Sequence, residues 1–194
     1  VTMTSSTGAP CILGQSAGKL KLTCSGINTL TDTAAAVNAD TSGVIYGDCD
    51  ITVTKNSTGT LNITSSMNTA IRSKDDIRLN GGDISINTDV DATSDADAIR
   101  ANNTLEIDGA SVTVTSSADG LKSSKEDVSI LSGKVSIKAG NDAVQAATAL
   151  NISGGTVTAS GDRGFTLDEN GVLAITGGNV LATATDYAFG MDFA

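Results

Sequence analysis

The sequence predicts an all-β protein, a parallel β-helix in which each coil of about 22 residues carries three short strands. Two observations support this fold. An apolar-x-apolar pattern returns at a nearly constant period, and turns that contain glycine or another small residue return with it. Parallel β-helices show such periods because each coil pairs only with the coils before and after it.

The clearest repeat is a pair of apolar-x-apolar strands joined by a short turn. The second apolar residue of this repeat falls at positions 79, 107, 130, 152 and 175, which gives steps of 28, 23, 22 and 23 residues. The alternation places every second side chain in a core. The five copies span 77–86, 105–114, 128–137, 150–159 and 173–182. A third short strand is expected at 70–72, 98–100, 120–122, 143–145, 164–166 and 188–190.

The chain before residue 70 repeats less clearly. Apolar segments at 44–46, 51–53 and 61–63 indicate one earlier coil, whereas residues 1–43 hold no clean copy. We therefore expect a single structural domain with an N-terminal cap over 1–43 and a β-helix over 44–194, since terminal repeats of solenoids are usually atypical. A short helix is expected between Thr31 and Asp40. The last rung, at 187–194, is expected to be open or covered by something outside the chain.

The composition excludes several kinds of function. With 12 basic and 22 acidic residues the formal net charge is −10, which argues against nucleic acid as a partner. The chain has no histidine, so Ser-His-Asp triads, Cys-His dyads and histidine-ligated zinc sites are excluded. Aromatic residues make up 3% and tryptophan is absent, so an aromatic sugar platform is not expected. No apolar run is long enough to span a membrane.

The compartment and the cysteines are predicted together. The composition and the fold favour a secreted or cell-surface protein, and a start at Val1 is consistent with a mature chain. The cysteines are Cys11, Cys24 and Cys49. A Cys11–Cys24 disulfide is favoured, Cys24–Cys49 is a second pairing, and three buried free thiols are the alternative.

Aspartates gather in one column and one loop. Asp97, Asp119 and Asp142 each precede a third strand, so neighbouring coils would place their carboxylates about 5 Å apart and favour a raised pKa or a bound cation. A longer segment before Asp97 adds oxygen ligands at alternate positions: Asp89, Asp91, Thr93 and Asp95. This spacing predicts calcium as a cofactor, held by the loop, by Asp97 and by the column. The alternative is a solvated acidic loop with carboxylates that bond their own turns.

A second column follows the apolar residue of each third strand and holds Arg72, Arg100, Lys122 and Gln145. A row of cations could bind the carboxylates of an acidic polymer, with arginine offering bidentate geometry. The alternative is that these cations pair with nearby acids, for which Asp75, Asp76, Glu106 and Glu126 are the candidates.

Three segments carry a family resemblance: residues 119–124 (DGLKSS), 141–146 (NDAVQA) and 150–159 (LNISGGTVTA). They resemble the coils of bacterial secreted carbohydrate-binding domain proteins. The resemblance covers residues 70–190 and implies a right-handed parallel β-helix, similar in shape to pectate lyases. It also implies association with calcium and binding of plant cell-wall polysaccharides such as pectin and cellulose. The family's aspartate column falls on Asp97, Asp119 and Asp142, whereas residues 1–43 have no counterpart.

Three functions follow from these observations. The leading hypothesis is a non-catalytic module that binds an acidic polysaccharide together with calcium. The second is a structural or filament subunit that self-associates through the open ends of the β-helix, because an unpaired rung is a template for another chain. The third is a polysaccharide lyase, for which Arg100 or Lys122 beside Asp97 and Asp119 is the only constellation with a base.

Overall fold

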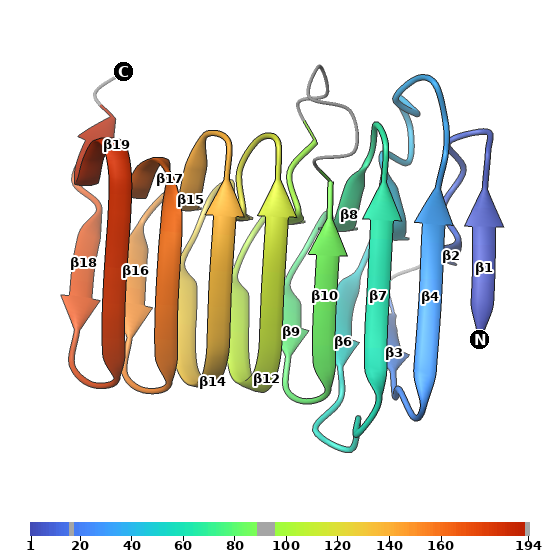
Figure 1. Cartoon of the computed structure of the whole chain (residues 1–194), viewed down its shortest axis with the longest axis horizontal. Coiled ribbons are helices and arrows are strands. Elements are labelled where there is room, and N and C mark those ends of the chain that lie inside the picture. The colour runs from blue at the N-terminus through green and yellow to red at the C-terminus, as the bar shows by residue number, and fades with distance from the viewer. Residues whose placement is uncertain (16–17, 89–95, 193–194) are drawn as a thin grey trace.

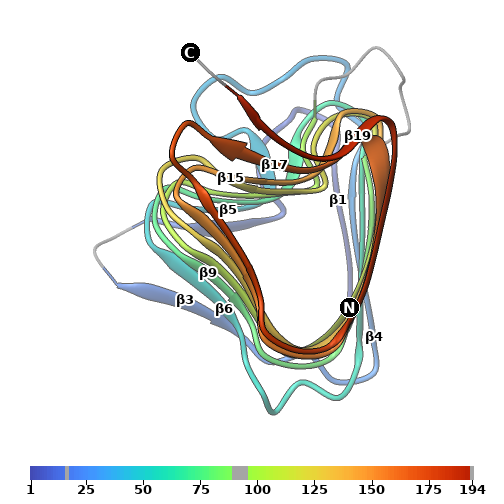
Figure 2. The same cartoon turned by 90° about the vertical axis from the view of Figure 1, so that its left-hand side faces the viewer.

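The predicted parallel β-helix is confirmed. A computed structural model describes residues 1–15, 18–88 and 96–192, and these form a solenoid of about eight coils with about 23 residues in each. Figure 1 shows the coils side by side along the long axis, with the two termini at opposite ends. Figure 2, a view along that axis, shows the coils superimposed as a rounded triangle.

Three parallel sheets run along the solenoid. Sheet 1 contains β1 (Thr2–Ser5), β4 (Ile27–Asp32), β7 (Thr60–Ser65), β10 (Asp83–Asn87) and parts of the long strands β12 (Leu105–Ser116), β14 (Val128–Ala139), β17 (Thr156–Asp168) and β19 (Asn179–Asp192). Sheet 2 contains β2 (Ile12–Gly14), β5 (Gly43–Gly47), β8 (Thr69–Ser73), β11 (Ile99–Ala101), β13 (Leu121–Ser123), β15 (Asp142–Ala146) and the second parts of β17 and β19. Sheet 3 contains β3 (Lys19–Leu22), β6 (Asp50–Val53), β9 (Ile77–Leu79), the first parts of β12 and β14, β16 (Ala149–Ile152) and β18 (Val172–Ile175).

The core consists of columns of aliphatic side chains that are stacked coil on coil. In sheet 3, Ile107 lies between Leu79 and Ile130, and all three side chains are fully buried. In sheet 2, Ile99 lies between Ile71 and Leu121 in the same way. Because like side chains repeat in register, aliphatic residues fill this narrow interior closely without large rings. This explains a stable core in a chain so poor in aromatic residues.

Glycine is required where the chain turns from sheet 3 into sheet 1. Gly133, within β14, has a φ of +95°, and a Cβ atom at this position would lie 2.2 Å from the carbonyl oxygen of Ala110 in the preceding coil. A residue with a side chain would therefore be strained by its backbone and would also collide with its neighbour. The recurrence of glycine at this turn is a packing requirement of the stacked coils.

Residues 1–43 contain four strands that continue the sheets. β1 pairs in parallel with β4, β2 with β5, and β3 with β6. The expected helix between Thr31 and Asp40 is wrong: β4 extends to Asp32, and the chain then bends without helical hydrogen bonds. The carboxylate of Asp32 accepts the N–H of Ala34, and the amide oxygen of Asn38 accepts two backbone N–H groups. Such local bonds compete with a helix.

Candidate functional site

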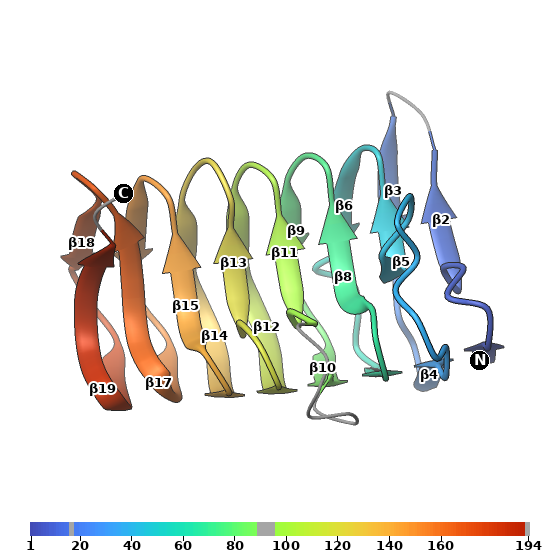
Figure 3. The ribbon, with the colours of Figure 1, turned by 90° about the horizontal axis from the view of Figure 1, so that it is seen from above.

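Sheet 2 places the predicted column of cations in one outward row. Arg72 of β8 lies beside Arg100 of β11, Arg100 beside Lys122 of β13, and Lys122 beside Gln145 of β15. Figure 3 looks onto this sheet, with the four strands next to one another. Since neighbouring strands are about 4.8 Å apart, the four side chains form a row along the solenoid axis.

The aspartate column runs beside this row and is buried. Asp97, Asp119 and Asp142 are 6%, 2% and 1% exposed. The carboxylate of Asp97 accepts the backbone N–H of Asp119 at 3.3 Å, and that of Asp119 accepts the backbone N–H of Asp142 at 3.1 Å. Each of these two carboxylates therefore binds the backbone of the next coil. This gives the column a structural role that its sequence spacing did not reveal.

Cationic side chains neutralise the aspartate column. Lys122 Nζ lies 2.6 Å from Asp119 Oδ2, and Arg100 Nη1 lies 3.5 Å from Asp97 Oδ2. Asp142 pairs with Arg163, whose Nε lies 2.6 Å from Oδ1. Arg100 and Lys122 thus pair with the aspartate column itself and not with the more distant acids considered from the sequence.

Burial and the neighbouring carboxylate raise the pKa of one aspartate in the column. Burial raises the pKa of Asp97 to about 6, and the neighbouring charge of Asp119 adds to this shift. Lys122, Arg100 and the backbone N–H of Asp119 act in the opposite direction but do not cancel it. A hollow of about 290 Å³ opens at this point, with Asp97, Arg100, Asp119, Lys122 and Asn141 among its lining residues.

Arg72 differs from the other cations of the row. Arg100 and Lys122 each follow an aspartate by three positions, whereas Thr69 occupies the equivalent position before Arg72. Within the described residues Arg72 has no carboxylate partner. Its guanidinium donates to the hydroxyl of Ser42, and its buried Nε has no hydrogen-bond partner. Burial and the positive charge of Arg100 lower the pKa of Arg72, and the attraction of Tyr46 and Asp97 offsets this only in part.

The other end of the row also has an unused polar atom. Oε1 of Gln145 is buried and accepts no hydrogen bond within the described part of the chain. Buried polar atoms without partners are uncommon in folded proteins, and each one calls for an explanation. The row thus has internally paired cations at its centre and unsatisfied groups at Arg72 and Gln145.

The predicted calcium ligands fall into two groups. Asp89, Asp91, Thr93 and Asp95 lie outside the described residues. Asp97, Asp119 and Asp142 are described, and their oxygens suit calcium chemically. However, Asp119 and Asp142 already accept short bonds from Lys122 and Arg163. These two carboxylates are therefore poor candidates for the coordination of a metal ion, whereas the longer contact of Asp97 leaves it more available.

The structure adds one acidic cluster that sequence reasoning missed. Oxygen atoms of Asp50, Asp75 and Asp76 lie within 4.8 Å of one another. The cluster contains cations as well: Lys19 Nζ lies 2.8 Å from Asp50, and Arg78 lies 2.7 Å from Asp76. Asp50 and Asp76 face each other because each precedes a strand, and the register pairs Ile51 of β6 with Ile77 of β9. This position before an apolar strand was the signal that the sequence offered for the cluster. Lys19 and Arg78 thus pair with Asp50 and Asp76, and Asp75 accepts a hydrogen bond from the side-chain amide of Asn103.

The cysteines do not form the favoured disulfide. Cys11, Cys24 and Cys49 are all free thiols, and the Cys11 Sγ–H donates to the carbonyl oxygen of Thr31. Burial raises the pKa of Cys11 and of Cys24. Cys24 and Cys49 are buried within the first coils, where they act as small apolar groups, whereas Cys11 is only partly buried.

Comparison with known proteins identifies a family. Within the described residues, no helix is long and apolar enough to cross a membrane. No curated protein and no solved structure gives a significant match to the chain. A family model described as carbohydrate-binding domain-containing protein matches residues 1–186, which include the N-terminal segment for which the sequence offered no counterpart. The chain therefore belongs to the carbohydrate-binding domain-containing protein family.

Proposed function

We propose that this protein is a non-catalytic module that binds an acidic polysaccharide along the outward row of sheet 2. The observation that carries the proposal is Arg72, a cation with no carboxylate partner among the described residues and a buried Nε that donates to nothing. A carboxylate of the ligand would supply the missing counter-charge to the guanidinium. Arginine is well suited to this because its planar fork binds carboxylates in bidentate fashion.

The shape of the row suits a polymer. Gln145 lies three coils from Arg72, and its partly buried side-chain amide would hydrogen-bond to a second sugar unit. Two cations, Arg100 and Lys122, lie in the coils between these two residues. Each stays paired with its aspartate and retains N–H groups that can donate to ligand oxygens. The family supports a carbohydrate as the ligand, and the lack of tryptophan favours recognition by polar side chains.

The proposal includes a calcium ion, bound by residues 89–97. Asp89, Asp91, Thr93 and Asp95 would provide most of the oxygen ligands, with Asp97 as the described carboxylate next to them. Bound calcium would supply a positive charge that bridges protein and ligand carboxylates. Such polymers lie outside the cell, so the proposal includes a secreted or cell-surface location.

Binding is favoured over catalysis by the state of the candidate bases. A lyase needs an unprotonated base near the sugar, whereas the Lys122 ammonium is held by Asp119 at 2.6 Å and the Arg100 guanidinium faces Asp97. Both cations serve as counter-charges and not as bases in this arrangement.

The decisive experiment gives Arg72 a counter-charge from within the chain and leaves the arginine itself unchanged. Thr69→Asp places a carboxylate where the aspartate column holds one in the following coils, and Thr69→Asn is the matched neutral control. Loss of a buried charged partner costs about 2–5 kcal/mol, so calorimetric titration with oligogalacturonate should show at least about 30-fold weaker binding for Thr69→Asp and for Arg72→Gln. Thr69→Asn and Arg78→Gln, a charge removal on sheet 3, should bind like the wild type.

The titrations are run with calcium and with a chelator, and a neutral cello-oligosaccharide serves as the ligand control. Tighter binding of oligogalacturonate in calcium is expected, together with a separate signal when calcium alone is titrated. If the wild type binds oligogalacturonate in neither condition, the proposed function is wrong. Unchanged binding by Thr69→Asp would remove Arg72 from the site.

A further inference from the structure

The outward row of sheet 2 is open over only part of its length. Its partly exposed members, called the open row below, are Arg72, Arg100, Lys122 and Gln145. The register continues with Tyr46 beside Arg72 and with Thr166 beside Gln145, and these two side chains are 1% and 0% exposed. At about 4.8 Å for each coil, the open row is about 14 Å long. It is therefore short, and a buried residue follows it on each side.

Tyr46 ends the open row on the side of Arg72. Its hydroxyl donates to Asp48 Oδ1 at 3.0 Å, which fixes the position of the ring. The segment between β4 and β5 lies on the outer side of sheet 2, as Figure 2 shows, and its Ser42 accepts a hydrogen bond from the guanidinium of Arg72. Beyond Tyr46 the register continues with Leu13, whose apolar side chain offers no partner to a charged ligand. A ligand that follows the row thus gains no contact past Arg72.

Tyr187 ends the open row on the side of Gln145. The row continues from Gln145 through Thr166 to Gly190, and a Cβ atom at Gly190 would collide with the ring of Tyr187. The ring therefore occupies this position of the row. Arg163 Nη1 donates to the tyrosine hydroxyl at 3.3 Å and helps to hold the ring there. The chain contains two tyrosines, and one of them lies at each end of the open row.

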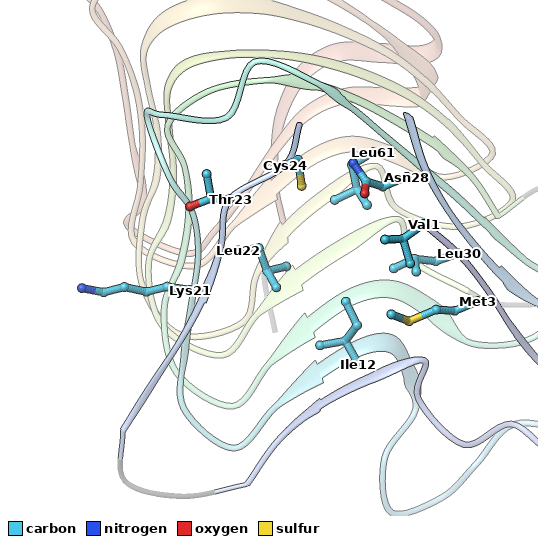
Figure 4. A pocket seen from close by; sticks show the side chains of 10 residues that line it. All are labelled: Val1, Met3, Ile12, Lys21, Leu22, Thr23, Cys24, Asn28, Leu30 and Leu61. Carbon is cyan, nitrogen blue, oxygen red and sulfur yellow. The ribbon is translucent and has the colours of Figure 1, made fainter. Parts of the chain in front are cut away.

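A hollow in the first coils does not suit an acidic ligand. Its volume is about 200 Å³, and Ile12, Leu22 and Leu30 are among the residues that line it. Figure 4 shows these three side chains pointing into the hollow, whereas the ammonium group of Lys21 points away from it. An apolar hollow cannot replace the hydration of a carboxylate, so a charged ligand would be bound unfavourably there. The open row, with its cations, is the better site.

We infer that the open row takes a short segment of an acidic polysaccharide, about four sugar units long, between Tyr46 and Tyr187. The inference rests on the proposed function and adds the length of the ligand. A pyranose unit extends a polysaccharide by about one coil spacing, so each open position faces about one unit. A longer chain must leave the sheet at the tyrosines, where it gains no further contact. The favoured ligands are therefore short acidic fragments and chain ends.

Calorimetric titration with oligogalacturonates of two, four, six and eight units measures the length of the site. The titrations are run in chelator, so that calcium does not link ligand chains to one another. The tetramer should bind at least about 10-fold more tightly than the dimer, because it forms additional hydrogen bonds to charged groups. The hexamer and the octamer should gain only the statistical factor that comes from the larger number of positions in which they can bind.

Tyr187→Ala tests whether the tyrosine ring ends the site. The substitution removes the ring over Gly190 and opens the row toward Thr166. In this variant the hexamer should bind at least about 3-fold more tightly than the tetramer, after correction for the statistical factor. Tyr187→Phe is the matched control, because it keeps the ring and should keep the length dependence of the wild type. Circular dichroism checks that both variants keep the wild-type strand content.

The outcomes separate the length of the site from the proposed function. If the affinity of the wild type keeps rising from the tetramer to the octamer beyond the statistical factor, the inference is wrong and the proposed function stands. An unchanged length dependence in Tyr187→Ala would show that Tyr187 does not end the row. If no oligogalacturonate binds at any length, in calcium as well as in chelator, the proposed function is wrong and the inference fails with it.

Discussion

The buried carboxyl group of Asp97 makes the stability of this protein depend on pH in a direction that is unusual for an aspartate. Burial, with repulsion from Asp119, raises the pKa of Asp97 to about 6 from its ordinary 3.8. At this group the folded chain binds a proton more tightly than the unfolded chain, so the contribution of Asp97 to stability is fully present below pH 3.8 and is lost as the pH rises through 6. The difference between 3.8 and about 6 corresponds to about 3 kcal/mol of unfolding free energy.

Asp97→Asn tests this reasoning because asparagine imitates the protonated carboxyl group and can still accept the N–H of Asp119. Urea unfolding is measured at pH 3.5 and at pH 7.5 in chelator, so that calcium does not contribute. From the lower to the higher pH, the stability of the variant should rise by about 3 kcal/mol relative to the wild type. Asp83→Asn, an exposed site on β10, should show a change of less than about 0.5 kcal/mol. If Asp97→Asn loses stability relative to the wild type as the pH rises, the carboxylate is favoured by its surroundings and the argument fails.

Three further predictions follow from the fold. Asp142→Ala should destabilise the protein by about 3 kcal/mol in urea unfolding, because it leaves the guanidinium of Arg163 without its buried partner; a loss below about 1 kcal/mol would contradict this. Gly133→Ala should lower the unfolding free energy by more than about 2 kcal/mol, since its Cβ would collide with the carbonyl oxygen of Ala110. Gly26→Ala, which has open space around it, should lower the unfolding free energy by about 1 kcal/mol. Equal losses in the two variants would show that the collision is relieved. A thiol reagent should titrate three thiols per chain in denaturant without reductant, and one thiol would reveal a disulfide.

The fold could be predicted from the sequence because stacked coils convert local pattern into long-range order. The expected strands at 77–86 and 128–137 appear as β9 with β10 and as part of β14. The first coils were not recognised in the sequence because their inward residues, such as Met3 and Ile12, belong to strands of three or four residues separated by irregular turns. Only pairing with β4 and β5 reveals that they share the register, and pairing is not visible in a single coil.

The site could be predicted only in part, for a related reason. The sequence identified the two columns that sheet 2 places side by side, with Arg100 and Lys122 next to the aspartates. It offered the aspartates as metal ligands or as partners of their own turns, and it did not show that Asp97 and Asp119 bind the backbone of the next coil and the cation three residues later. Which partner a carboxylate takes depends on distances of a few ångströms, and sequence spacing does not determine these. Thr69 occupies the position that holds aspartate in the following coils. This difference was visible in the sequence, and it is the signal that distinguishes Arg72 from the other cations.

This arrangement limits how a binding site can arise on the solenoid. A cation in the outward row lacks a carboxylate of its own coil only where the aspartate is missing, as at Arg72. Removal of an aspartate elsewhere would expose a second cation, but it would also remove an acceptor for the next coil, since Asp119 receives N–H groups from both Asp142 and Asn141. An unsatisfied buried donor costs about 1–3 kcal/mol, so each added binding position would be gained at the expense of stability. At Thr69 no described hydrogen bond from the following coil depends on the side chain, and a free cation is tolerated there because the stacking of coils does not need its partner.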